Sequence, residues 1–421
     1  MPLASTAGDD GPPVPADGRP ELTDPAAFAE GVPHHRFAEL RRQAPVAWQD
    51  EQDGPGYWAV TRYADCVRVN RDWESFSSYR RGTLARELPE MVLAQQRLIM
   101  LNMDPPVHTR YRRLVNRAFT PRIVAALVRR VHQIADEIID RVVERGEADF
   151  VTDLAAELPL VVIAELLGIP GEDRRQMFEW SNALVGSADP EYQTSEGLVH
   201  RSAMELYVYA SELFAEKRKR PGDDLLSMLA EVDIDGEKLS DVELELFFLL
   251  LMVAGNETTR NLVSGGMAAF FDHPDQWQLV VDRPFLVPTA VEEMLRFVTP
   301  VMHFRRQATR TVDLGGQRIE EDDKVVFFHV SANRDEEVFT QPQRFDVTRD
   351  PNPHLAFGGG GPHFCLGANL ARMEARVMFE HLVHRMPGLA PGGEVRRLRS
   401  AFINGVKHLP VVFPPGPPVR G

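Results

Sequence analysis

The stretch Ala356–Arg372, AFGGGGPHFCLGANLAR, places four glycines and a histidine just before Cys365, one of only two cysteines in this 421-residue chain. A zinc site needs about four Cys, His or carboxylate ligands, and His354 and His363 do not complete one. A phosphate-binding loop needs a Lys followed by Ser or Thr after its glycines, and neither pair follows here. A Cys–His nucleophile stays open, although no oxyanion hole or third group is apparent nearby.

A thiolate at the start of a helix suits the stretch better. Glycines at 358–361 allow positive φ and close approach of the backbone to a flat ligand. Free amides after Cys365 and the positive end of a helix both favour a charged sulfur. Gly367 leaves room for a tight turn into that helix, and a thiolate of this kind is a known ligand of heme iron. Cys66, in an apolar helical segment, is instead predicted to be an ordinary core cysteine.

Composition narrows the class of protein. Hydrophobic residues make up 43% of the chain, enough for a large core in one domain or two closely joined ones. Two cysteines exclude a disulfide framework and favour a reducing compartment. A net charge of -15 is atypical of a nucleic-acid-binding surface, although a local basic patch for an acidic protein partner stays open.

No targeting or membrane segment is expected. Residues 1–20 are rich in Pro, Gly and Asp, lack the pattern of a signal peptide and are predicted to be a disordered tail. The longest apolar run, Leu246–Gly255, is too short to span a bilayer. The sequence therefore predicts a cytoplasmic protein with no membrane span.

The predicted fold class is mainly α with small β-sheets set apart from the helices, an α+β arrangement in a single domain at residues 21–421. Residues 57–69 favour a strand followed by a helix, and residues 104–275 are mostly helical. Residues 310–330 favour a hairpin made of a strand, a Gly-Gly turn and an apolar strand. A further helix is expected at about 366–385. The β-rich segments are expected near 45–65, 310–330 and 395–415.

One helix stands out by its length. Ser240 and Glu243 form a capping-box pattern at its start. The helical pattern continues to about Asp272, giving a helix of about 48 Å. Because it is apolar nearly all round from Leu246 to Ala254, it is expected to be buried.

The motif AGNETTRN, Ala254–Asn261, interrupts this apolar helix. Gly255 weakens the helix, and a buried Glu257 needs a partner or a proton. Thr258 can bond back to the carbonyl four residues earlier and bend the helix. Two interpretations stay open: a polar stripe that faces solvent, or a distorted turn that faces a small ligand.

From about residue 20 to 415 the chain resembles a bacterial cytochrome P450, and its motifs occur in the order of that family. They are HTRYR with His108 and Arg112, AGNETT, EMLR with Glu293 and Arg296, FRRQA with Arg306, ANRDEEVF, PQRFDVTR and GGGPHFCLG. AGNETTRN, DIDGEKLSD, SANRDEEVF, LNMD and NGVKH also resemble the actinobacterial steroid side-chain hydroxylase branch. One departure concerns the aromatic residue usual seven positions before the cysteine: Gly358 stands there and Phe357 lies eight before. Either the loop is one residue longer, or its glycines shift the phenylalanine.

The resemblance implies heme b, with Cys365 as the axial ligand of its iron. The residues expected to contact the heme propionates are His108, Arg112, Arg306 and His363, and Phe357 and Gly367 are further expected heme contacts. Glu293 and Arg296 would form a buried ion pair that braces the fold near Cys365.

On the dioxygen side of the heme, Ala254 and Gly255 would open the helix to admit dioxygen. Thr258 would hydrogen-bond to it, and Glu257 would pass protons through water. No bound flavin or NAD(P) is expected, so electrons would come from a ferredoxin and its reductase. An acidic ferredoxin needs a basic face, for which the candidates are Arg110, Arg113, Arg117, Arg372 and Arg376.

The implied function is hydroxylation, with dioxygen, of a bulky hydrophobic substrate, either steroid- or terpenoid-like or a secondary metabolite. The candidate pocket residues, which would equally suit core packing, are Leu84, Met100, Met252, Val301, Met302, Phe402 and Ile403. The alternatives are a natural-product P450 performing epoxidation, desaturation or oxidative coupling, a non-catalytic heme sensor, and a hydrolase that uses Cys365 without heme.

Overall fold

The computed structural model describes residues 21–419 except 52–53, 117–120, 194, 196, 232 and 235. The tail predicted at residues 1–20 lies outside these ranges. The described chain is mainly helical with small, separate sheets, which confirms the predicted fold class. No helix of the described chain combines the length and apolarity needed to cross a membrane.

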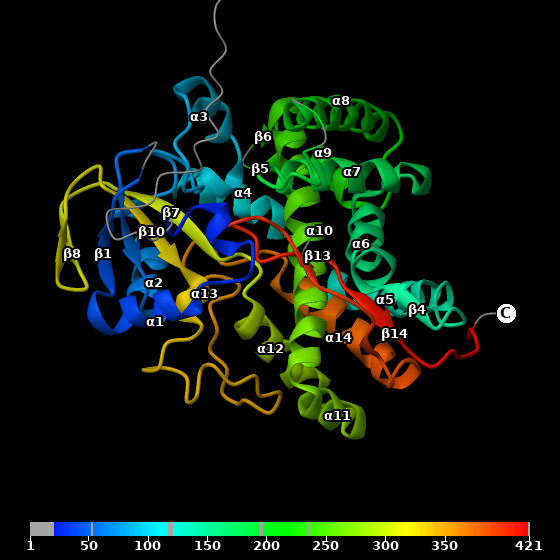
Figure 1. The fold of residues 1–421 in the computed structure, drawn as a ribbon. Coiled ribbons are helices and arrows are strands. Elements are labelled where there is room, and N and C mark those ends of the chain that lie inside the picture. The colour runs from blue at the N-terminus through cyan, green and yellow to red at the C-terminus, as the bar shows by residue number, and fades with distance from the viewer. Residues whose placement is uncertain are drawn as a thin grey trace, which may run out of the picture.

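The helices surround one long central helix (Figure 1). The α-helices are α1 His34–Gln43, α2 Tyr63–Arg71, α3 Glu90–Gln96, α4 Val107–Asn116, α5 Pro121–Asp140, α6 Glu157–Leu167, α7 Arg174–Val185, α8 Leu198–Lys219, α9 Leu225–Glu231, α10 Asp241–Asp272, α11 Pro274–Asp282, α12 Val287–Val298, α13 His329–Ala332 and α14 Ala368–Arg385. Short 3-10 turns are η1 Pro25–Phe28, η2 Met100–Asn102, η4 Gly171–Asp173 and η5 Pro284–Leu286, and η3 Phe150–Ala155 is a π-helix.

The strands form one five-stranded sheet and several smaller ones. They are β1 Val46–Gln49, β2 Tyr57–Val60, β3 Phe76–Ser77, β4 Glu147–Asp149, β5 Asp233–Ile234, β6 Glu237–Lys238, β7 His303–Ala308, β8 Val312–Leu314, β9 Gln317–Ile319, β10 Lys324–Phe328, β11 Ala390–Pro391, β12 Arg396–Arg397, β13 Val406–His408 and β14 Pro410–Val412. The five-stranded order is β1-β2-β10-β7-β3, in which only β2 and β10 are parallel neighbours.

The long helix α10 begins and ends where the sequence predicted. The Ser240 hydroxyl accepts the Glu243 backbone N–H at 3.3 Å, and the Glu243 carboxylate accepts the Ser240 backbone N–H at 2.7 Å. Two otherwise unpaired donors at the helix start are thereby satisfied. The helix runs through the middle of the molecule and packs against α6, α8, α12 and α14 (Figure 1).

The central strand β10 is buried on both faces. Val325 and Phe327 belong to one core cluster, which includes Cys66, and Val326 and Phe328 belong to another. This division follows from the alternation of side chains along a strand. Cys66 is fully buried on α2, as predicted for a core cysteine.

The predicted hairpin at 310–330 is wrong in its second strand. Gly315 and Gly316, with φ of 56° and 79°, form the turn between β8 and the short polar strand β9. The apolar strand β10 follows β9 and pairs with β7 and β2 instead. Its continuous apolar run suits a central position in a sheet covered on both faces.

Candidate functional site

The cysteine loop closes on itself through one backbone hydrogen bond. The Cys365 amide donates to the Phe357 carbonyl at 2.9 Å, across the intervening glycines. The Gly358 amide donates to the Leu355 carbonyl at 2.9 Å. The loop then enters α14, whose first residue, Ala368, lies two positions after the predicted start.

Three of the four glycines of the loop adopt the predicted positive φ, but some of the glycines approach a different neighbour. Gly358, Gly360 and Gly361 have φ of 92°, 90° and 79°. A Cβ on Gly361 would lie 2.6 Å from the Asn70 carbonyl oxygen, and one on Gly359 would lie 3.0 Å from the Cα of Val67. The prediction that these two glycines admit a flat ligand is therefore corrected: they let the loop pack directly against α2.

Cys365 is an exposed residue, although its thiol lies among protein atoms. Burial raises the pKa of the Cys365 thiol, while the Gly367 amide and the charges of Arg112 and Arg372 lower it. The amide at the helix start therefore favours the thiolate, as the sequence predicted, but burial opposes this effect. A coordinated metal ion deprotonates a cysteine directly. A Cβ on Gly367 would point into open space, so this side of the loop is uncovered by protein.

Four basic side chains from three parts of the chain converge beside this loop. His108 and Arg112 lie one turn apart on α4, Arg306 lies on β7, and His363 lies in the loop. The ring centroids of His108 and His363 are 4.3 Å apart. Arg306 is buried, and its guanidinium lies 5.2 Å from the centre of the Phe327 ring.

Burial and the neighbouring positive charges lower the pKa values of the two histidines. Burial, followed by the charges of Arg112 and Arg306, lowers the pKa of His108 to about 4. Burial and the charges of Arg306, His108 and Arg112 hold the pKa of His363 well below its usual range. Burial lowers the pKa of Arg306 to about 10, and Asp104 opposes this shift. The cluster is therefore positive and short of anionic partners.

The donor set fits the carboxylates of a porphyrin. Buried cations require anionic or hydrogen-bonding partners, and guanidinium forks match carboxylates well. Asp104 is itself occupied: it accepts the Ser78 amide at 2.8 Å and the Ser77 hydroxyl. Arg306 and Arg112 each donate to a backbone carbonyl but bond to no carboxylate of the described residues, so their charges suit an external dianion next to Cys365. His363 already lies 3.2 Å from the Ser78 hydroxyl through its Nε2.

The turn Ala254–Thr258, near the middle of α10, keeps partial access to solvent. Thr258 donates its hydroxyl to the Ala254 carbonyl at 2.7 Å, as the sequence predicted. Ala254 is exposed and Thr258 half-buried, whereas Asn256, Glu257 and Thr259 are buried. The missing side chain of Gly255 faces α6, where a Cβ would lie 3.1 Å from Cδ1 of Ile163. Its role in admitting dioxygen stays a prediction.

Glu293 and Arg296 form a fully buried ion pair on α12. Arg296 donates to both carboxylate oxygens, at 2.7 and 2.8 Å. It also donates to the carbonyls of Asn333 and Pro342, in the segment between α13 and the cysteine loop. The pair therefore anchors the segment that leads into that loop.

Sequence reasoning missed a second anchor beside the loop. Glu292 accepts Arg372 at 2.7 Å and lies 3.0 Å from the imidazole of His354. The Arg372 guanidinium also lies 4.5 Å from the centre of the half-buried Phe357 ring. The adjacent glutamates of VEEMLR were the available signal, because Glu292 and Glu293 hold two different segments.

The candidate pocket residues lie in several environments. Met100 and Met252 belong to the helical core, Met302 to the core around Phe28, and Leu84 is half-buried. Val301 forms an isolated bridge with Ile403, and Phe402 stacks on His303. Their roles in substrate binding stay predictions.

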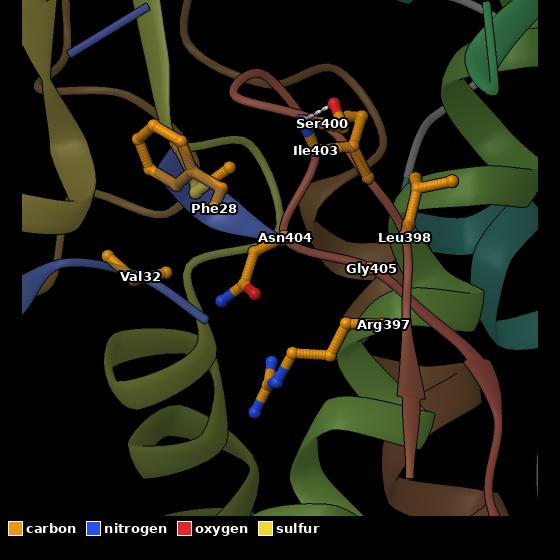
Figure 2. Close-up of a pocket in the computed structure, with 9 residues that line it drawn as sticks. Phe28, Val32, Arg397, Leu398, Ser400, Ile403, Asn404 and Gly405 are labelled. Atoms are coloured by element: carbon orange, nitrogen blue, oxygen red, sulfur yellow. Dashed lines mark hydrogen bonds between the residues drawn. The ribbon is translucent and has the colours of Figure 1, made fainter. Parts of the chain in front are cut away.

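Figure 2 shows the hollow that Met302 and Ile403 help to line, between the N-terminal segment and the chain after β12. The Ser400 hydroxyl accepts the Ile403 amide there at 3.0 Å. This hollow has no volume that a water molecule could enter. It is therefore part of the packed structure and holds no ligand.

The candidate ferredoxin-binding arginines are not equally available. Arg113 is exposed on α4, and Arg117 lies outside the described residues. Arg376 pairs with Glu380 at 3.1 Å, and Arg372 is held by Glu292. Arg110 is half-buried on α4.

Comparisons with known proteins agree with this geometry. A family model described as Cytochrome P450 matches residues 274–396. The steroid C26-monooxygenase of Mycobacterium tuberculosis is 44% identical over 404 residues, covering 93% of this chain and 92% of that protein. The methyl-branched lipid omega-hydroxylase of the same species is 42% identical over 401 residues, covering 92% of each. A Mycobacterium marinum cytochrome P450 solved in complex with pseudoionone has a TM-score of 0.88 at 39% identity, covering 96% of this chain and 100% of that one.

The fold and these likenesses define a class of oxidising enzyme. The chain belongs to the cytochrome P450 family, and it is a P450 monooxygenase. Membership of this family implies heme iron as cofactor and dioxygen as co-substrate. The cysteine, the cationic cluster and the accessible turn of α10 are the parts of this chain that suit them.

Proposed function

We propose that the enzyme hydroxylates a bulky apolar substrate, steroid- or terpenoid-like or a comparable secondary metabolite, using electrons from a ferredoxin and its reductase. The observation that carries the proposal is the partly accessible polar turn Ala254–Thr258 in the mostly buried middle of α10. Relatives named for oxidising a steroid and a methyl-branched lipid support the substrate class.

Residues around the loop would hold the cofactor, heme b. Cys365 would bind its iron through sulfur, and Arg112, Arg306, His108 and His363 would bind its carboxylates. When bound, this group supplies the chemistry that activates dioxygen. The protein supplies position, charge and protons.

Thr258 would orient oxygen and water above the cofactor. Its hydroxyl proton is engaged by the Ala254 carbonyl, so its oxygen is free to accept a hydrogen bond. Glu257 would accept a proton from water and pass it on toward Thr258 through water. Electrons would arrive at the face that carries Arg113, where an acidic ferredoxin finds exposed positive charge.

Absorption spectra and product masses test the proposal. The reduced, carbon monoxide-treated protein should show the spectrum of a thiolate-bound heme, and its absence would remove the proposal. Sterols and terpenoids should then shift the heme spectrum more than polyketides do. A product that gains one oxygen supports hydroxylation or epoxidation, whereas loss of hydrogens indicates desaturation or coupling.

A variant separates oxygen activation from binding. Thr258→Ala should bind substrate but release most electrons as hydrogen peroxide, with product per electron falling about tenfold or more. Ser264→Ala is the matched control, because its hydroxyl makes the same type of bond, to the Arg260 carbonyl at 2.8 Å, in a buried position. Equal product yields from both variants would contradict the role of Thr258.

A further inference from the structure

A buried ion pair lies where α10 meets α7. Glu257 and Arg260 are one helical turn apart, form a salt bridge and have side chains only 1% and 2% exposed. Ser181 of α7 donates its hydroxyl to Glu257 at 3.1 Å. Asn182 of α7 accepts from Arg260 at 2.7 Å. Both members of the pair are therefore tied to α7.

The pair is directed away from the accessible turn. Ala254 and Thr258 retain solvent access, whereas Glu257, the residue directly before Thr258, is buried against α7. Successive helical residues point about 100° apart. The carboxylate that would supply protons to Thr258 is thus fixed by groups outside the oxygen site.

This network has unused hydrogen-bonding capacity. Asn256 donates to the Ser181 hydroxyl at 3.3 Å, but its carbonyl oxygen is buried without a partner. The Nε of Arg260 is likewise buried without a partner. One acceptor and one donor beside Glu257 are therefore suited to bind water, which is the usual partner of such buried groups.

We propose that Arg260, together with Ser181 and Asn182, is a positioning residue that keeps Glu257 ionised and sets its place relative to Thr258. An isolated buried carboxylate takes up a proton. A guanidinium prevents this without giving up a proton of its own. Glu257 therefore remains able to accept a proton from water and pass it on, and the position of α7 governs that transfer.

This inference rests on the proposed function, but one of its tests does not. In the purified heme-containing enzyme, infrared absorption detects a protonated carboxyl group, and Glu257→Gln identifies the band. We expect the band to appear in Arg260→Met as the pH is lowered from about 8 to about 5. Wild type and Arg260→Lys should lack it. Arg175→Met is the matched control, because Arg175 pairs with Glu179 on the surface of α7.

The second readout is product formed per electron across the same pH range. In Arg260→Met this yield should fall about tenfold as the carboxyl band appears, and Arg260→Lys should restore the wild-type profile. A purely structural role would lower the yield equally at every pH. An unchanged pH profile without a carboxyl band would overturn the proposal.

Two further variants test the proposal even if Arg260→Met does not fold. Asn182→Ala and Ser181→Ala keep the ion pair and remove one α7 contact each, so smaller shifts in the same direction are expected. No shift in either variant, with Arg260→Met unfolded, would also overturn the proposal. If the wild type binds heme but oxidises none of the substrates, the proposed function fails while the infrared titration still reports on Arg260.

Discussion

Replacing Glu293 by Gln should remove a large part of the stability of the enzyme. The Glu293 carboxylate accepts two hydrogen bonds from the Arg296 guanidinium, at 2.7 and 2.8 Å. It also accepts the Arg349 guanidinium at 3.0 Å, the Asn352 amide at 3.0 Å and the Asp346 backbone N–H at 2.9 Å. All its hydrogen-bond partners here are donors, and two of them carry a positive charge.

The magnitude follows from this donor set. A glutamine offers one acceptor oxygen, and its NH2 group would face donors where the second carboxylate oxygen was. Breaking a fully buried ion pair costs about 3–5 kcal/mol. Since a folded protein is stable by only about 5–15 kcal/mol, Glu293→Gln should lose roughly a fifth or more of that stability.

Denaturant unfolding, followed by circular dichroism and by the heme spectrum, measures this loss. Glu179→Gln is the control, because its partner Arg175 is 90% exposed and such a pair contributes about 0–1 kcal/mol. We expect a much lower midpoint for Glu293→Gln and an almost unchanged one for Glu179→Gln. Unfolding free energies of the two variants within about 1 kcal/mol of each other would refute the reasoning.

Two further predictions concern the cysteine loop and the β13 strand. Gly361→Ala should lower the unfolding midpoint and loosen heme more than Gly236→Ala, because both glycines have positive φ but only Gly361 would place a Cβ against Asn70; equal effects would contradict the packing argument. Burial acts to lower the pKa of His408, but its bonds to Glu191 and Asp149 outweigh burial and raise it. The stabilisation from His408 is therefore fully present below its ordinary pKa of about 6.5 and lost as the pH rises through the raised value. The difference in melting temperature between wild type and His408→Gln should become smaller as the pH rises through the pKa of His408. A difference that stays constant with pH would count against the linkage.

Local sequence signals predicted the parts of the fold that depend on neighbouring residues. The capping box of Ser240 and Glu243 fixed the start of α10, and Thr258 bonds to the carbonyl four residues before it. Both interactions form within one helical turn and need no knowledge of the tertiary fold. The positive φ of the loop glycines was predictable for the same reason.

Tertiary partners could not be predicted in this way. The glycine loop packs against α2, nearly 300 residues earlier, and the Gly359 carbonyl accepts Arg71 there at 2.8 Å. Glu257 needed a partner, as its burial required, but its sequence did not indicate Ser181 on α7. Burial, which raises the pKa of the Cys365 thiol, likewise depends on the tertiary fold and was not indicated by the local glycine and helix-start pattern.

Two motifs that are far apart in the sequence form a single structural unit. The side chain of Asn261, which ends AGNETTRN, donates to the Glu257 carbonyl at 2.8 Å and accepts the Val406 amide at 3.2 Å. Val406 lies within NGVKH, and a Cβ on the preceding Gly405 would lie only 3.1 Å from the Asn261 oxygen. A glycine is therefore required where β13 passes this helix. The next residue, Lys407, pairs with the buried Asp189 at 2.9 Å, in the segment between α7 and α8. Glu257 is therefore hydrogen-bonded to α7 through Ser181 and linked to β13 through Asn261. A shift of either element would displace the same turn of α10.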